Sequence, residues 1–160
     1  IDAWRFPSFF SERSNVDDSS ISSLACGHNV IAVANLDDPG ERIHITSSQG
    51  PTRDSRWKPE IAAPGTQIVA AKGFAGNDDL WIAMTGTSMA SPCACGVAGL
   101  MLAAQPRLTS SQINGMMVRT ARPLPGGTFA WKNDAGFGRL DPAACLREAR
   151  SAFVRKDVRS

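Results

Sequence analysis

Hydrophobic residues fall into short, β-branched runs in the first half of the chain and into one long run of small residues in the second half. Residues 29–36 (NVIAVANL) form a nearly continuous apolar run, which is typical of a strand buried on both faces. Residues 42–46 (RIHIT) alternate and predict a shorter strand. Two more strands are expected at residues 67–71 and 80–84, and the Pro-containing stretch 47–64 is expected to be loop.

The longest helix is expected from Ser88 to Gln105, because this uncharged segment ends at a proline, Pro106. Its lack of a polar face predicts that it is buried all round. The whole uncharged stretch 80–106 is long enough to cross a membrane. We prefer a buried segment of a globular fold and expect no membrane span, since polar residues and a proline occupy the first half of the stretch (Thr85–Pro92).

Two shorter helices are expected after this one. Thr109 or Ser110 should cap a helix that reaches about residue 120. Asp141 and Pro142 form an N-cap and first-turn pair for a last helix, which should end near residue 150. Strands followed by helices in this order predict an α/β sandwich.

One structural unit is expected over residues 1–150, because no repeat and no clear boundary divides the chain. Within it, residues 1–27 mix aromatic side chains with a polar run and are expected to form a surface loop with a few anchoring rings. Residues 151–160 are charged and are expected to form a short, mobile tail.

Composition excludes several classes of protein. With 42% hydrophobic and 20% charged residues among 160, the chain has the make-up of a globular domain. A net charge of +2 without a basic stripe gives no reason to expect a nucleic-acid partner. Four cysteines are too few for a disulfide-rich scaffold. Cys93 and Cys95, at i and i+2 on a helix, point to different faces, so we expect buried apolar side chains there and no metal site or cofactor.

A serine stands where an expected strand meets the longest helix, in the segment Thr85–Pro92 (TGTSMASP). Gly86 permits a sharp turn and a close backbone approach at this junction. The start of a helix points free N–H groups and a partial positive charge at its surroundings. A nucleophile for acyl transfer, such as the hydroxyl of Ser88, needs that arrangement for the oxyanion that forms. Spacing alone leaves open an ordinary serine or threonine cap on a helix.

The segment Gly86–Pro92 resembles the nucleophile motif of the subtilisin-like serine proteases, the subtilases. The match is nearly complete and favours a nucleophile over a helix cap. Four other segments resemble the family's motifs in the family's order, and they are Asn29–Val33, Ser47–Pro51, Lys58–Gly65 and Gly136–Asp141. The resemblance covers the chain from about residue 20 to residue 150.

The resemblance implies a three-layer α/β/α sandwich on a mainly parallel sheet, of which this chain is the C-terminal part. It implies a serine endopeptidase that hydrolyses polypeptides through an acyl-enzyme, with Ser88 as the nucleophile. The family's pattern carries two further sets of residues over to this chain. Gly86, Thr87 and Met89 would form the nucleophile turn and its oxyanion-binding surroundings, and Ser22, Ser23, Leu24 and Ala25 would line the specificity pocket.

The family's other catalytic motifs do not occur in this chain. The family uses an Asp in an Asp-Ser/Thr-Gly motif, a His in a His-Gly-Ser/Thr motif and an oxyanion Asn. His28 and His44 fit neither pattern and are expected to be structural or surface residues, and Ala75–Asn77 is expected to be a loop turn. An N-terminal partner segment is therefore expected to supply the three groups, and the chain alone to be inactive. Residues Ile1–Arg5 form no signal peptide and suggest a processed or truncated chain. The resemblance alone favours export.

The same residues fit two other catalytic motifs poorly. An α/β-hydrolase needs a glycine at the position of Ala90 and a histidine after Ser88, and the sequence has neither. A Ser-x-x-Lys site at Ser55–Lys58 is disfavoured because Pro59 follows directly in an expected loop. A non-catalytic binding or regulatory partner built on a degenerate protease fold stays open.

Overall fold

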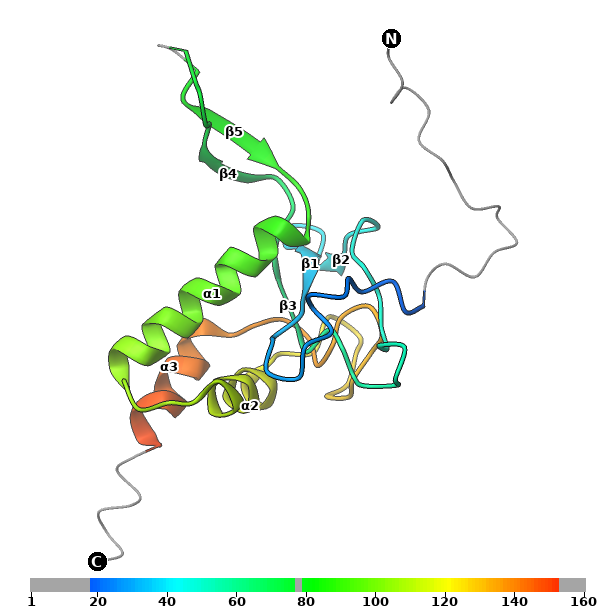
Figure 1. The fold of residues 1–160 in the computed structure, drawn as a ribbon, viewed down its shortest axis with the longest axis vertical. Helices are drawn as coiled ribbons and strands as arrows, with labels where there is room; N and C mark the ends of the chain where they lie inside the picture. The colour runs from blue at the N-terminus through cyan, green and yellow to red at the C-terminus, as the bar shows by residue number, and fades with distance from the viewer. Residues whose placement is uncertain (1–17, 77–78, 153–160) are drawn as a thin grey trace, which may run out of the picture.

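The computed structural model describes residues 18–76 and 79–152, and it has a small sheet at its centre (Figure 1). Strand β1 (Val33–Asp37) is the middle strand of this sheet. It pairs in parallel with β3 (Ile61–Pro64), with Val33 opposite Ile61, and antiparallel with the short β2 (Arg42–Ile43). The parallel pair positions the end of β3 beside the start of the longest helix.

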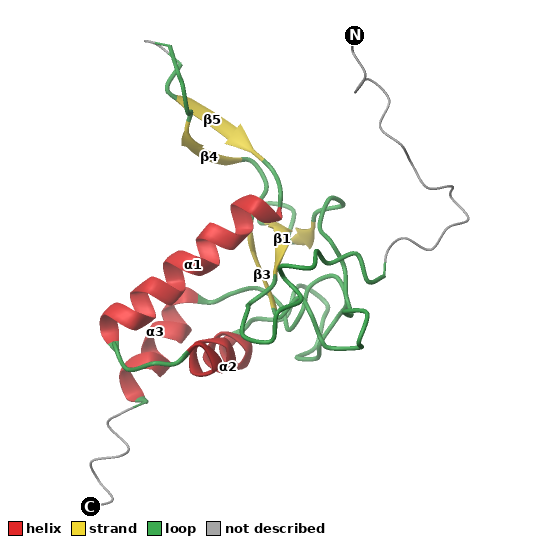
Figure 2. Ribbon diagram, in the orientation of Figure 1, coloured by secondary structure: helices red, strands yellow, loops and turns green. Residues whose placement is uncertain are grey.

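Three helices gather on one side of the molecule (Figure 2). Helix α1 (Thr87–Ala104) packs against β1 and β3, α3 (Pro142–Ser151) packs against α1, and α2 (Ser110–Thr120) packs against α3. Their buried side chains form one hydrophobic core with Ile61 and Ala63 of β3. All three helices predicted from the sequence are confirmed, each to within about one residue at its ends.

The sheet differs from the prediction most at β3, and the first two strands are also shorter than predicted, since β1 begins at Val33 rather than at residue 29 and β2 ends at Ile43 rather than at residue 46. Residues 47–64 were expected to be loop, but β3 occupies residues 61–64, and its Ile61, Ala62 and Ala63 are completely buried. Alanine has little intrinsic preference for strands, so a four-residue segment rich in alanine gives almost no periodic signal. The strand exists because β1 lies along one side of it and α1 covers it.

Residues 136–140 extend the hydrogen bonding on the other side of β3. The Phe137 N–H donates to the Glu60 carbonyl (2.9 Å), and the Leu140 N–H donates to the Ala62 carbonyl (2.8 Å). Gly136 has a φ of 61°, and a Cβ atom there would lie 2.4 Å from the Glu60 carbonyl. Both the left-handed backbone and the close contact require glycine, which explains physically the first glycine of the motif at 136–141.

Two of the predicted strands form a hairpin apart from the sheet. β4 (Ile68–Ala71) and β5 (Trp81–Met84) pair antiparallel and project away from the helices (Figure 1). Val69 and Trp81 are each 65% exposed, so the expected burial of these strands on both faces is not met within the described chain. A two-stranded hairpin alone is marginally stable in water, and these apolar side chains would gain stability from a cover.

Helix α1 is covered on one face only. Ala90, Ala94, Val97 and Met101 are buried, but Leu100 on the opposite side is 54% exposed. The remaining exposed residues of that face are small or apolar, and they are Ser88, Ser91, Pro92, Cys95, Gly96, Gly99, Leu102 and Ala103. The expected burial all round is therefore not reached within the described chain. By length and composition alone this helix could also cross a membrane.

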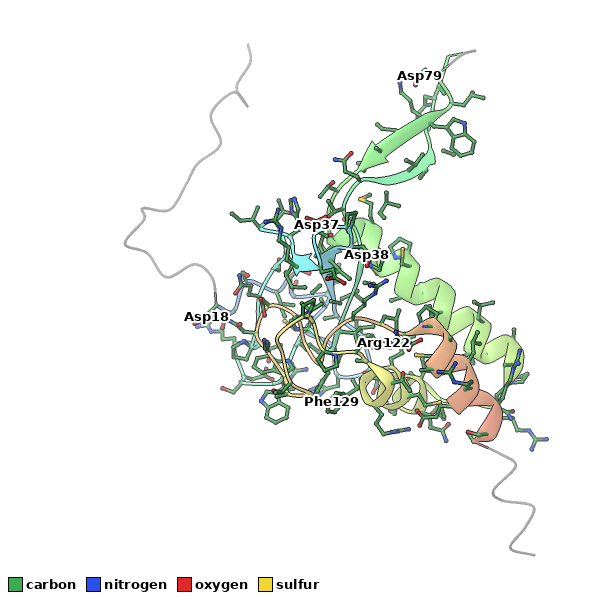
Figure 3. All side chains as sticks on the ribbon, turned by 180° about the vertical axis from the view of Figure 1, so that it is seen from behind. Asp18, Asp37, Asp38, Asp79, Arg122 and Phe129 are labelled. Carbon is green, nitrogen blue, oxygen red and sulfur yellow. The ribbon has the colours of Figure 1, made fainter. Side chains whose placement is uncertain are left out.

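The predicted caps of the two shorter helices are confirmed. Thr109 caps α2 through a reciprocal pair with Gln112, whose backbone N–H donates to the Thr109 hydroxyl and whose side chain accepts from the Thr109 N–H. Asp141 caps α3 by accepting from the Ala144 N–H (3.0 Å) and from Nε of Arg122 (2.6 Å), and Arg122 is labelled in Figure 3. These interactions, chiefly the Ala144 bond, hold the pKa of Asp141 below its usual range.

Replacing Asp141 with alanine should lower the free energy of unfolding by about 1 to 2 kcal/mol at pH 7, since both the cap and the Arg122 partner are lost. The pKa of Asp141 is lower in the folded state, so its contribution is present above about pH 4 and disappears as the pH falls through the folded value. Urea unfolding of the wild type and of Asp141→Ala at pH 7 and at pH 3 measures the loss in the free energy of unfolding at each pH. Equal losses of stability from Asp141→Ala at both pH values would contradict the prediction.

Two expectations fall at the ends of the chain. The anchoring aromatic residues of segment 1–17 and most of the predicted tail lie outside the described residues. Ser151, expected to begin the tail, is the last residue of α3, so the helix extends one residue further than predicted. The extent of the unit at 1–150 stays a prediction.

Candidate active site

Ser88 is exposed in the first turn of α1, at the end where backbone N–H groups are free. Gly86 is the N-cap, and its carbonyl accepts from the Met89 N–H (3.0 Å) and the Ala90 N–H (3.3 Å). The N–H groups of Thr87 and Ser88 have no acceptor in the described part of the chain. The first turn therefore offers two unengaged donors and the positive end of an 18-residue helix beside a serine hydroxyl.

A proline inside the helix changes the same turn. Pro92 stands four residues after Ser88 and has no N–H, so the Ser88 carbonyl lacks the usual helical donor. Met89 is half-buried, and its sulfur lies about 4.0 Å from where a Cβ at Gly86 would stand. The nucleophile turn predicted at Gly86, Thr87 and Met89 thus surrounds Ser88, and its catalytic role stays a prediction.

The close backbone approach at the junction belongs to Gly65 rather than to Gly86. A Cβ atom at Gly65 would lie 2.5 Å from Asn35 Oδ1, 2.7 Å from the Gly86 carbonyl oxygen and 2.9 Å from Ala90 Cβ. At Gly86 no such atom lies nearer than 3.8 Å. The Gly86 N–H donates to the Gly65 carbonyl (2.8 Å), so the end of β3 holds the start of α1 directly. The sequence placed the close approach at Gly86, which has a φ of 158° that residues with a side chain rarely adopt, but the missing Cβ that the contact requires is that of Gly65.

Buried polar groups support this contact from the side of β1. Asn35 is completely buried, and its backbone N–H donates to Ser47 Oγ (3.0 Å). Its side-chain oxygen accepts from Thr66 Oγ1 (3.2 Å), in the residue after Gly65. Asn35 therefore links β1 to the residues after β3 that hold the start of α1. The sequence did not reveal this role.

A cavity of about 490 Å³ opens beside Ser88, and its volume suits a side chain or a small ligand. None of its lining residues is charged, and they include Thr87, Ser88 and Ser91 of α1 together with residues 30–33 before and at the start of β1. Three of the four residues expected to form a specificity pocket line this cavity, namely Ser22, Leu24 and Ala25. Ser23, the fourth, is not among the lining residues.

Neither histidine contacts Ser88 by a hydrogen bond. His44 was expected within a strand, but β2 ends at Ile43, and His44 Nδ1 lies 2.9 Å from Thr46 Oγ1 in the following turn. His28 lines a different cavity, near the start of α2. Within residues 18–76 and 79–152, Ser88 therefore has no hydrogen-bonded base. Of the predicted turn at 75–77, Ala75 and Gly76 lie between β4 and β5, and Asn77 is outside the described residues.

The two neighbouring cysteines take different environments. Cys93 packs against the core, whereas Cys95 is exposed, so the expectation of a buried side chain is wrong for Cys95. The i, i+2 spacing places them on different faces of α1, as the sequence indicated. In the described residues no cluster of three metal-ligating side chains forms.

The chain is similar to known proteins of one family. The sequence model of the Subtilase family, Peptidase S8, matches residues 11–138. The chain is 36% identical over 122 residues to the halolysin-like extracellular serine protease Nep of Natrialba magadii, covering 76% of this chain and 20% of that protein. It is 31% identical over 137 residues to the serine protease AprX of Bacillus subtilis (strain 168), covering 76% and 29%. The chain thus spans less than a third of the length of these relatives.

Solved structures give the same fold. The CspB protease of Clostridium perfringens superposes with a TM-score of 0.69 at 22% identity, over 82% of this chain and 29% of that one. Fervidolysin from Fervidobacterium pennivorans, a keratinolytic enzyme related to subtilisin, superposes with a TM-score of 0.62 at 28% identity, over 74% and 19%. The predicted α/β fold and the resemblance are confirmed, and the chain belongs to the subtilase family of serine proteases, peptidase family S8.

Proposed function

We propose that this chain supplies the nucleophile Ser88 of a serine endopeptidase that hydrolyses polypeptides. The observation that carries the proposal is the position of Ser88, exposed in the first turn of α1, beside two unengaged N–H groups and at the rim of an uncharged cavity. Membership in a family of serine proteases supports it. The small, uncharged cavity lining suits an apolar side chain of a substrate.

In the proposed reaction, the Ser88 hydroxyl oxygen attacks the carbonyl carbon of the scissile peptide bond. A histidine takes the hydroxyl proton and then gives it to the leaving amine. The oxyanion that forms accepts a hydrogen bond from the Ser88 N–H, which needs no rearrangement because it is already unengaged. Water then hydrolyses the acyl-enzyme and restores the serine. In this proposal the chain supplies the nucleophile and one oxyanion donor, whereas the proton transfer and the second oxyanion donor come from the partner segment.

An N-terminal partner segment completes the site in this proposal. It would bring the Asp, the His and the oxyanion Asn to the Ser88 side of α1. Two surfaces support the idea that such a segment docks here, the uncovered face of α1 and the exposed hairpin of β4 and β5. Both are apolar, and a cover of protein would bury them without enclosing any charged side chain of α1, which has none. The same docking places α1 in a protein interior rather than in a membrane.

A fluorophosphonate probe tests the proposal, since it reacts with serines that are activated by a base. The assembled protein, this chain with its N-terminal segment, should be labelled, and mass spectrometry of its peptides should place the adduct on Ser88. The 160-residue chain alone should remain unlabelled and should not turn over a peptide substrate, because a serine without a base is barely nucleophilic at neutral pH.

Each of three results would overturn all or part of the proposal. Labelling of the assembled protein at a serine other than Ser88 would move the nucleophile elsewhere. No labelling at all, in an assembled protein that unfolds cooperatively, would favour a binding or regulatory protein on a degenerate protease fold. Turnover by the rigorously isolated chain would contradict the need for a partner segment.

A further inference from the structure

A buried ion pair lies behind the wall of the cavity beside Ser88. Lys58 and Glu60 stand on either side of Pro59, just before β3, and their side chains are only 4% and 10% exposed. Lys58 Nζ lies 2.7 Å from Glu60 Oε1. Burying two charges costs several kcal/mol per ion unless their remaining donors and acceptors are also satisfied. The other atoms that these two side chains contact are therefore informative.

Both side chains reach the same short stretch of backbone. Lys58 Nζ also donates to the Val30 carbonyl (2.5 Å), and Glu60 Oε2 accepts from the Ala32 N–H (2.7 Å). The Glu60 backbone N–H donates to the Ala32 carbonyl (3.0 Å). Residues 30–32 precede β1, and the strand pairing with β3 begins only at Val33. Two ionic side chains therefore make hydrogen bonds to this stretch that a neighbouring strand would make within a sheet.

The stretch that they hold is a wall of the cavity. Val30, Ile31 and Ala32 line it, together with Pro59 and Ser88. A change in the position of residues 30–32 therefore changes the shape of the cavity into which a substrate side chain would fit. Hydrogen bonds to charged groups are directional and short, so they restrict this backbone more narrowly than apolar packing would.

We propose that Lys58 and Glu60 are positioning residues that fix the wall at residues 30–32 and thereby set the selectivity of the cavity beside Ser88. The inference rests on the proposed function of Ser88. Neither residue lines the cavity or hydrogen-bonds to Ser88, so in this proposal they act on the binding of the substrate side chain rather than on the chemical step. A buried ion pair is a weak source of stability, because apolar residues of equal volume often stabilise a fold as well or better.

The test uses the assembled protease and two peptide substrates that differ only in the residue entering the cavity, one with a large apolar side chain and one with glycine. Glu60→Gln leaves one amide oxygen where two carboxylate oxygens served Lys58 and the Ala32 N–H. We expect kcat/KM for the large substrate to fall by about tenfold or more, chiefly through KM, because displacement of a binding wall by about 1 Å has effects of this size. The value for the glycine substrate should stay within about twofold.

A double variant separates positioning from stability. Lys58→Met with Glu60→Leu removes both charges and fills similar volume, so the thermal midpoint should match or exceed that of Glu60→Gln. The ratio of kcat/KM for the large substrate to kcat/KM for the glycine substrate should stay as low as in Glu60→Gln, because the bonds to Val30 and Ala32 are also lost in the double variant. This variant also carries the test if Glu60→Gln does not fold. Ile113→Ala is the control for lost stability, because Ile113 is buried in α2 and does not line the cavity. This variant should leave the ratio of the two kcat/KM values unchanged.

The possible outcomes separate a failure of the positioning role of Lys58 and Glu60 from a failure of the proposed function of Ser88. If the wild-type protein takes no fluorophosphonate at Ser88, the proposed function is wrong and the inference is overturned with it. If the wild type is labelled but the folded variants keep the wild-type ratio of the two kcat/KM values, only the positioning role is overturned. Recovery of the ratio in the double variant, or an equal loss in Ile113→Ala, would also overturn it.

Discussion

Replacing Ser88 with alanine is expected to lower the kcat of the assembled protease by about a millionfold, which is the scale of loss when a triad nucleophile is removed. Alanine has no oxygen to attack the substrate, so only binding and the free N–H groups of the helix start would remain to accelerate hydrolysis. Because the Ser88 side chain is exposed and its hydroxyl makes no hydrogen bond to another described residue, the fold should be unaffected. Initial rates with a peptide substrate and a thermal unfolding curve measure both effects.

The chain provides a matched control at another helix. Ser111 holds the second position of α2, as Ser88 holds the second position of α1, and it is also exposed. Ser111→Ala makes the same change in helix propensity and in exposed hydroxyl groups, and it should leave kcat within about twofold. A Ser88→Ala protein that retained more than a hundredth of the wild-type rate would show that another group is the nucleophile.

Local signals in the sequence identified the helices well. The capping roles of Thr109 and Asp141 follow from side-chain chemistry within three residues, so they could be predicted without knowledge of the fold. The position of Ser88 could be predicted for a related reason, since the turn and the helix start are both encoded in the segment 85–92. The features that could be predicted from the sequence are those that depend on residues within about four positions along the chain.

Contacts between distant segments explain what the sequence did not show. The need for glycine at Gly65 arises from Asn35 and Ala90, which lie 30 and 25 residues away along the chain. Strand β3 is defined by its pairing with β1, and its alanines carry no signal of their own. The link from Glu60 to the Ala32 N–H likewise joins segments that no local pattern connects.

Burial was predicted from composition, and here the outcome depends on what lies outside the described chain. Helix α1 and the β4–β5 hairpin are as apolar as core elements, yet each leaves large side chains exposed. The composition of a segment indicates whether it is suited to a buried or an exposed environment. It does not indicate which part of the polypeptide, or which other polypeptide, covers the segment. The prediction of cover on all sides is therefore a prediction about the assembled protease.

The uncovered face of α1 makes that prediction testable with one substitution. Gly96 is exposed in the middle of the helix, and a Cβ atom there would meet nothing within 4 Å. Gly96→Phe should therefore be tolerated by this chain, and replacing a glycine even raises helix propensity. If the N-terminal segment packs closely over this face, the added ring should weaken association by about tenfold to a hundredfold, since overpacking a tight interface costs about 1 to 3 kcal/mol.

Co-expression of the chain and the N-terminal segment as two polypeptides, followed by gel filtration and a peptidase assay, measures the effect. Ala143→Phe is the control, because it adds the same ring to an exposed position of α3, away from the face of α1. Both variants should be equally soluble, and only Gly96→Phe should lose co-elution and activity together. A Gly96→Phe chain that co-elutes and cleaves substrate like wild type would show that the N-terminal segment docks elsewhere, and the exposed apolar face of α1 would then need a different occupant.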